Sequence, residues 1–353
     1  METAQRIVFL DYLRVIACFM VILVHSCEFY YCGPTEVFFN SVDDRFWVAL
    51  IDSALRAAVP LFVMASSYLL VPLTTDSTTF FKRRFVRVFV PFVIWSVLYA
   101  CLPVWLGRVD GDVAERLSRL MYNFNGDSGH LWFIYMLIGV YLVMPIISPW
   151  LKQVSRRGEE CFLVIWGVTT LWGYLHPWLG NLWGEAIWND FHALYYFSGF
   201  IGYVVLAHYF RTYIHWTTAK SVAIGLPIYL VGYAITAIVF YRHGAVSTDF
   251  AYVEQSWNFC TFNVALMTIG LFLMLSKINY KAKGLYGPVQ QVSKLSYGIY
   301  LMHIMLLGFV YDWIAPLFST PVSICLMALI CYAGCIAITK LLSYIPQSKW
   351  VIG

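Results

Sequence analysis

Residues 8–32 form an apolar stretch that nevertheless carries Asp11, Arg14 and His25. A charged side chain at the centre of a membrane costs at least ~2.5–3.5 kcal/mol, so such residues indicate a function or a buried partner. At 100° per residue, Arg14 and His25 point within about 20° of each other and lie roughly 16 Å apart along a helix. Asp11 lies within about 60° of the same direction. We therefore predict a polar helix face that points into the protein rather than into lipid.

Spacing alone leaves the roles of these three residues open. Asp11 and Arg14 are three residues apart and can form a structural ion pair on one helix face. Asp11 cannot orient His25 directly, because fourteen residues of helix extend about 21 Å. A histidine changes its charge near neutral pH and can act as a general base. A lone histidine near the end of a spanning helix is, however, often only an interfacial residue.

A second apolar stretch, residues 46–70, contains Asp52 and Arg56. Because they are four residues apart, they share a helix face, and we expect an ion pair that either joins helices or serves the function. Pro60 cannot donate a hydrogen bond to the backbone carbonyl of Arg56, which leaves that oxygen free within the membrane.

Basic residues cluster in the segment FFKRRFVRVFVP, where Arg84 and Arg87 share one face at the start of a predicted helix. Such residues commonly set the orientation of a membrane protein and contact anionic lipid headgroups. Two guanidinium groups at a helix N-terminus also form a good phosphate site. A phosphate-rich ligand from the cytoplasm would suit this segment.

Two later segments contain the remaining polar candidates. His130 and Trp132 follow a loop with two glycines in NGDSGHLWFIYML, where a belt of interfacial aromatic residues is the alternative explanation. Ser296, Tyr300 and His303 occupy positions i, i+4 and i+7 of one helix face in SKLSYGIYLMHIMLL. A buried structural histidine is the alternative explanation there.

The composition predicts a membrane protein. Of the 353 residues, 61% are hydrophobic and 12% are charged, which is about half the charge of a typical soluble domain. Apolar residues occur in blocks rather than in alternation, so we predict an all-α polytopic fold with about ten transmembrane helices and not a barrel. Residues 1–353 would form a single membrane-embedded domain. The predicted helices are residues 7–27, 46–70, 85–106, 130–149, 161–176, 191–210, 220–241, 257–276, 295–316 and 320–345.

The charges between these helices predict the orientation. If the N-terminus is cytoplasmic, most lysines and arginines outside the helices are cytoplasmic too, as the positive-inside rule requires. An even number of helices then places the C-terminus in the cytoplasm as well. We expect a multi-pass protein of the inner or plasma membrane, whose net charge of +4 implies no nucleic-acid partner. No cluster of histidine and cysteine indicates a metal; Cys27 and Cys32 can pair, although nothing requires it.

These segments, in this order, resemble the acyltransferase type 3 family of integral membrane acyltransferases. The resemblance covers nearly the whole chain and is closest to the compact bacterial O-acetyltransferases that modify surface polysaccharides. Ser67 follows Ser66 where the family usually has a glycine. The matching motifs are Arg14 and His25 separated by ten residues, R-x-x-V-P-L-F from Arg56, R-x-x-R at Arg84 and Arg87, H-L-W-F from His130, and S-x-G-I-Y-x-x-H from Ser296 to His303.

The resemblance implies transfer of an acetyl or similar acyl group from cytoplasmic acyl-CoA to a hydroxyl of an extracytoplasmic glycan. Acetyl-CoA would be a donor substrate, and no cofactor would be bound permanently. His25 would be the general base, with Arg14 and Asp11 as further catalytic residues. The residues expected to bind substrates are Arg84, Arg87, Arg56, His130, Trp132, Tyr300 and His303.

We expect a continuous polar passage, lined by Arg14, Arg56 and His303, along which the thioester reaches His25. The acceptor would enter near His130 and Trp132. Direct transfer and a covalent relay are both compatible with the sequence. A transporter or flippase of a lipid-linked sugar would also bury charges in a helical bundle, but it needs no CoA site. A succinyltransferase of the same family would differ in its donor.

Overall fold

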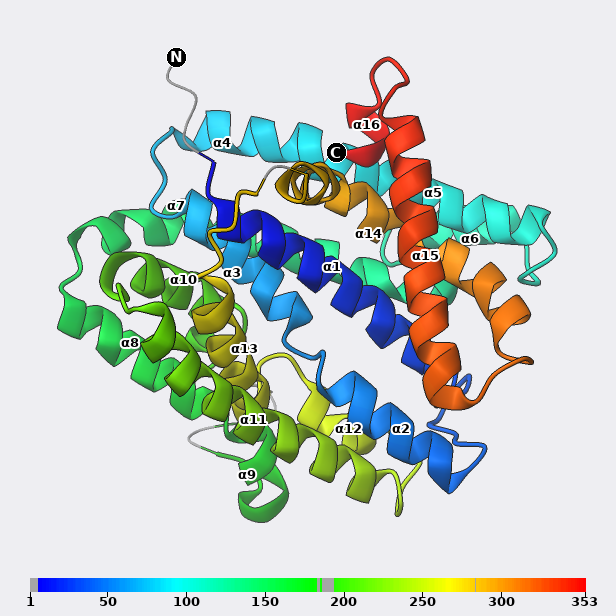
Figure 1. Cartoon of the computed structure of the whole chain (residues 1–353), viewed down its shortest axis with the longest axis horizontal. Coiled ribbons are helices and arrows are strands. Elements are labelled where there is room, and N and C mark those ends of the chain that lie inside the picture. The colour runs from blue at the N-terminus through cyan, green and yellow to red at the C-terminus, as the bar shows by residue number, and fades with distance from the viewer. Residues whose placement is uncertain (1–5, 183–184, 186–193, 283) are drawn as a thin grey trace.

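The structure, a computed structural model, describes residues 6–182, 185, 194–282 and 284–353. Within these ranges the regular elements are all helices (Figure 1). Among the described residues, eight helical segments are long and apolar enough to cross a membrane, which confirms the predicted all-α polytopic fold. These segments are α1 (Val8–Glu28), α2 and α3 (Val42–Ser53 and Ala58–Leu70), α4, the π-helix η1 and α5 (Ser77–Arg84, Phe85–Phe89 and Val90–Trp105), η2 and α7 (Gly126–Leu131 and Trp132–Gln153), α11 (Thr218–His243), η4 and α13 (Gln255–Trp257 and Phe262–Leu275), α14 (Tyr286–Ile314) and α15 (Thr320–Leu342). The shorter helices are α6 (Val113–Arg119), α8 (Arg156–Thr169), α9 (Trp172–Leu179), η3 (Tyr195–Phe197), α10 (Ile201–Tyr213), α12 (Phe250–Val253) and α16 (Lys349–Ile352).

Two of the predicted segments, 161–176 and 191–210, correspond to helices that are too short to cross a membrane alone. α8 and α10 have 14 and 13 residues, fewer than the ~17–25 that a spanning helix needs. The two helices pack together, and the carboxylate of Glu159 lies 2.9 Å from Nδ1 of His208 in a buried ion pair. The start of the predicted segment 191–210 lies outside the described residues.

The predicted helix over 46–70 is broken in the middle. α2 ends at Ser53 and α3 begins at Ala58. The ring of Pro60 clashes with a helical carbonyl four residues earlier, which here belongs to Arg56. The break therefore places Arg56 in a short irregular segment between α2 and α3. Its side chain is thus free of the direction that a continuous helix would impose.

α1 crosses the centre of the bundle, and α3, α14 and α15 pack against it (Figure 1). α11 and α13 pack closely because glycines face each other across the contact: a Cβ atom on Gly270 would lie 2.4 Å from the carbonyl oxygen of Gly225. Small residues of this kind let membrane helices approach at the backbone. The bundle thus holds α1, with its polar residues, among neighbouring helices.

Candidate active site

Three histidines from three separate segments lie together. His25 is in the last turn of α1, His130 is in η2, and His303 is in α14. The ring centroid of His303 lies 5.1 Å from that of His25 and 5.1 Å from that of His130, while His25 and His130 are 6.3 Å apart. His130 and His303 are buried, whereas the His25 side chain keeps 15% of its exposure. The sequence offered these histidines as separate candidates, and the fold joins them in one histidine cluster.

Glu28 is the partner of His25. Its Oε2 atom lies 2.8 Å from His25 Nδ1. Because a carboxylate accepts hydrogen bonds, Nδ1 donates to Glu28, and Nε2 is the nitrogen left to accept a proton. In the described part of the chain, His25 Nε2 has no hydrogen-bond partner. Sequence reasoning missed Glu28, although its position three residues after His25 on the same helix was a usable signal.

The spacing of Asp11 and Arg14 had suggested an ion pair between them, but the structure does not form it. Its carboxylate lies 2.6 Å from Nη2 of Arg6, and it accepts hydrogen bonds from Ser293 at 2.6 Å and Tyr286 at 2.8 Å. Arg6 precedes α1 and can fold back on the first turn with two N–H groups, which a residue within the helix cannot do as easily. Asp11 therefore ties the start of α1 to α14.

A cavity of about 520 Å³, the basic cavity, lies beside this contact. Arg6 and Gly353 both line it, so the described ends of the chain lie on one side of the bundle, here called the basic side. Its volume falls within the range of ~300–1,000 Å³ that is typical of ligand sites. The lining cations are Arg6, Arg14, Arg84, Arg87 and Lys294.

Most cations of the basic cavity have no acidic partner. Apart from Arg6, none has a carboxylate within 4.0 Å among the described residues. Nε of Arg84 is buried without a hydrogen-bond partner. Arg84 ends α4 and Arg87 lies in η1, within one long helical segment that begins at Ser77. Arg84 and Arg87 therefore lie within this helical segment and not at its N-terminus, where the sequence had placed them.

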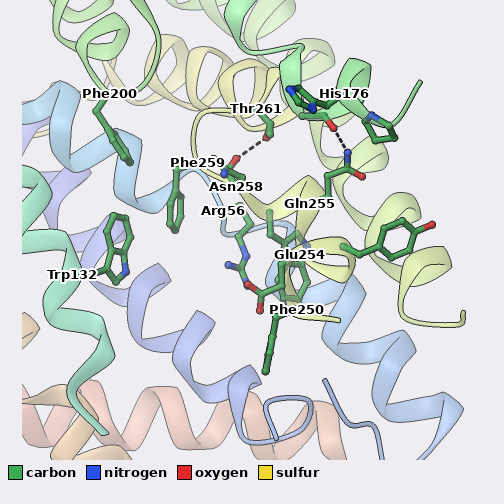
Figure 2. A pocket seen from close by; sticks show the side chains of 15 residues that line it. Arg56, Trp132, His176, Phe200, Phe250, Glu254, Gln255, Asn258, Phe259 and Thr261 are labelled. Carbon is green, nitrogen blue, oxygen red and sulfur yellow. Dashed lines mark hydrogen bonds between the residues drawn. The ribbon is translucent and has the colours of Figure 1, made fainter. Parts of the chain in front are cut away.

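A second and larger cavity, of about 1,050 Å³, is here called the aromatic cavity. Figure 2 shows Trp132, Phe200 and Phe259 on one side of it and His176 and Gln255 on the other, with Arg56 and Glu254 between them. The rings of Trp132 and Phe259 are stacked, with centroids 5.3 Å apart. Burial raises the pKa of the Glu254 carboxyl above its ordinary value, and Arg56 partly offsets that effect. The remaining residues that line it are Gly173, Pro177, Phe250, Ala251, Tyr252, Trp257, Asn258 and Thr261.

The expected ion pair of Arg56 and Asp52 is confirmed. The two side chains face each other through two atom pairs, Nε–Oδ1 at 2.6 Å and Nη2–Oδ2 at 2.7 Å. The guanidinium also lies over the ring of Trp257, 3.7 Å from its centroid. Glu28 and Glu254 both interact electrostatically with Arg56. Arg56 thus links the partner of His25 to the aromatic cavity.

The two cavities share no lining residue, and none of the three clustered histidines lines either of them. Trp132 lines the aromatic cavity, and the next residue, Phe133, lines the basic cavity. Tyr300 also lines the basic cavity, and its hydroxyl donates a hydrogen bond of 2.5 Å to the carbonyl of His130.

The described residues do not form the expected continuous passage between these two cavities. Arg14 lines the basic cavity, Arg56 lines the aromatic cavity, and His303 lines neither. The rings of Phe133 and Tyr300, whose centroids are 5.4 Å apart, both line the basic cavity, and Tyr300 also contacts the rings of His130 and His303. In the described part of the chain, no group of histidine, cysteine and carboxylate side chains could hold a metal ion.

Membrane-spanning helices that hold a histidine paired with a carboxylate, together with a basic and an aromatic cavity, are features of a membrane-embedded enzyme. A comparison with protein families gives its class: the model of the type 3 acyltransferase domain matches residues 7–340, nearly the whole chain. The chain belongs to the acyltransferase type 3 family and is a membrane acyltransferase. No curated protein and no solved structure matched it.

Proposed function

We propose that this protein is an O-acyltransferase that moves an acetyl group from acetyl-CoA to a hydroxyl of a glycan. The observation that carries the proposal is a histidine cluster with neighbours in both cavities: Trp132, two residues after His130, lines the aromatic cavity, and Tyr300, bonded to the carbonyl of His130, lines the basic cavity. The basic cavity suits a phosphate-rich donor and the aromatic cavity suits a sugar acceptor, so the histidines lie where the two would meet.

The basic cavity would hold the phosphates of acyl-CoA. Arg84 and Arg87 lie together there, and Arg14 and Lys294 add two further charges that have no acidic partner among the described residues. Charge-assisted hydrogen bonds from guanidinium to phosphate are short and strong. The pantetheine arm would extend toward Tyr300 and Phe133, which brings the thioester to the wall of the histidine cluster. No permanently bound cofactor enters this scheme.

The aromatic cavity would hold the acceptor. Trp132, Phe200 and Phe259 offer apolar ring faces, and Asn258, Gln255 and Glu254 offer polar groups that can bond hydroxyls. Few convergent polar groups on a mostly apolar wall are the usual form of a small-molecule site. A lipid-linked or surface glycan could reach this cavity from the side opposite the basic one.

His25 would act as the general base. The lone pair of Nε2 takes the proton of the acceptor hydroxyl, the hydroxyl oxygen attacks the thioester carbonyl carbon, and the C–S bond breaks. Glu28 would hold the ring in the required tautomer and stabilise the imidazolium that forms. This scheme transfers the acyl group directly, without an acyl-enzyme intermediate.

The basic side would face the cytoplasm, where acyl-CoA is made. The excess of lysine and arginine on this side supports that orientation through the positive-inside rule. The protein would then be a multi-pass protein of the cell membrane that carries an acyl group outward.

Mass spectrometry of the native surface glycan, from cells with and without this protein, tests the proposal. The expected result is loss of an acetyl substituent from one glycan position, restored by the wild-type gene. Loss of a succinyl substituent would show that the donor is succinyl-CoA rather than acetyl-CoA. Unchanged acyl substituents on the glycan, together with accumulated lipid-linked sugar, would favour a flippase.

A further inference from the structure

His303 is a buried titratable group that the scheme above does not use. Its side chain is fully buried in α14. Its Nδ1 atom is hydrogen-bonded to the backbone carbonyl of Tyr300. Because a carbonyl only accepts, Nδ1 carries the proton, and the neutral ring presents a lone pair at Nε2. That Nε2 atom is buried without a hydrogen-bond partner, which costs free energy and calls for a reason.

The surroundings of His303 Nε2 allow it to bind a proton transiently but do not stabilise a permanent positive charge on the ring. The titratable groups that face His303 are His25 from α1, His130 from η2, Tyr300 from its own helix, and Cys331 from α15, whose thiol donates to the carbonyl of His303. Among the described residues, no carboxylate lies within 4.0 Å of His303 that would hold the ring permanently charged.

The proposed reaction leaves the released proton on His25, whereas the group that must accept it is the CoA thiolate. After transfer, the proton of the acceptor hydroxyl is on His25, and the departing CoA carries a thiolate. His25 is held by Glu28, which interacts with Arg56 of the aromatic cavity. The thiolate lies on the other side, near Tyr300. His303 follows Tyr300 by one helix turn, with ring centroids 5.7 Å apart, and it is next to His25.

We propose that His303 is a second catalytic residue, which takes the proton from His25 and delivers it to the sulfur of the departing CoA. This role rests on the proposed transfer from acyl-CoA. The O–H bond of the acceptor and the C–S bond break, the ester C–O bond forms, and the proton passes through Nε2 of His303 to form the S–H bond. Both histidines end neutral. Tyr300 lines the basic cavity and its ring centroid lies 5.7 Å from that of His303, so the ring of Tyr300 would turn aside when the thioester enters.

The substitution His303→Asn separates this role from a structural one. The Asn side-chain amide can still donate to the carbonyl of Tyr300, as Nδ1 does, but it lacks the second nitrogen that would carry the proton. Transfer to native glycan in membranes of the producing cell would be measured with acetyl-CoA and with the acetyl selenoester of seleno-CoA. The selenol is more acidic than the thiol, so its anion leaves without a proton.

With acetyl-CoA, we expect kcat of the His303→Asn variant to fall about 10²-fold or more, as for the loss of a positioned acid, with KM little changed. With the selenoester, most of that loss should disappear. His208→Gln is the matched control, because His208 is a buried histidine that is paired with Glu159 and lies outside the histidine cluster. In this variant, the ratio of the rate with acetyl-CoA to the rate with the selenoester should equal that of the wild type.

Equal losses on both donors, or no loss on either, would overturn the role of His303. The proposed function itself fails in a different way: His25→Asn would then leave transfer intact, or the wild-type protein would transfer from neither donor.

Discussion

Glu28 decides which nitrogen of His25 is free to act as a base. The contact of 2.8 Å with Nδ1 leaves Nε2 as the acceptor. Glu28 is thus a positioning residue, which acts through His25 and not on the substrates.

We predict that Glu28→Gln lowers kcat by about 10²-fold and leaves KM for acetyl-CoA unchanged. A loss of this size lies within the rate enhancement that a positioned general base contributes. The neutral amide cannot stabilise the imidazolium that forms during transfer. Glu28→Asp should recover part of the rate, because it restores the charge. Steady-state transfer to native glycan measures this, with Glu36→Gln, an exposed acid of the loop that follows α1, as the control. A change in KM alone would assign Glu28 to donor binding instead.

Residue spacing predicted the pair of Asp52 and Arg56 but gave the wrong partner for Asp11. The pair of Asp52 and Arg56 was predicted from their spacing of four residues, and it forms although α2 ends at Ser53. The partners of Asp11 could not be predicted, because Ser293 and Tyr286 belong to a helix far along the chain. The contact of His25 with His303 also depends on how α1 packs against α14.

At the scale of elements, the junction of α4 and η1 presents Arg84 and Arg87 to the basic cavity. A single π-helical turn inside a longer helix is frequently found at a functional site. The sequence pattern identified these arginines, but it placed the helix start too late, because the apolar stretch begins after the polar first turn.

We predict that Arg84→Ala combined with Arg87→Ala weakens CoA binding, since each charge-assisted contact contributes roughly 1.5–3 kcal/mol. Calorimetry with CoA and the purified protein measures the effect. Arg83→Ala is the matched control, because Arg83 is exposed and does not line the cavity. Arg84→Lys should also lose affinity, because the planar fork is lost. An unchanged Kd in the double variant would remove the CoA site from this cavity.

A second element-scale prediction concerns the contact of α11 with α13. Gly270→Ala should destabilise the protein by about 1–3 kcal/mol, as overpacking does, because the new Cβ would lie 2.4 Å from the carbonyl of Gly225. Gly308→Ala is the control, since a Cβ there meets nothing within 4 Å. Thermal unfolding in detergent compares the two variants. Equal melting temperatures would mean that the helices can move apart at no cost.

At the scale of the whole molecule, composition and blocks of apolar residues were enough to predict a helical membrane bundle. The same features predicted membrane-spanning helices where the structure has the shorter helices α8 and α10, because hydropathy alone does not distinguish a spanning helix from a shorter apolar one. The two separate cavities could not be predicted, since they depend on packing between helices rather than on any one segment.

The proposed orientation makes a prediction at this scale. In a variant without native cysteines, Glu36→Cys should react with a membrane-impermeant maleimide in intact cells, and Lys281→Cys should react only after the cells are opened. Both positions are exposed and lie on opposite sides of the bundle by chain connectivity. The reverse pattern would place the basic cavity outside the cell, away from acyl-CoA.

The most direct test of the central claim is vectorial transfer by the purified protein in liposomes. Radiolabelled acetyl-CoA is supplied on the basic side, the native glycan is supplied on the other, and label in the glycan is counted for the wild type and for His25→Asn. We predict labelled glycan with the wild type and a loss of about 10²-fold or more in the variant, with CoA binding unchanged. Absence of label with the wild type, or an undiminished rate in the variant, would contradict the account.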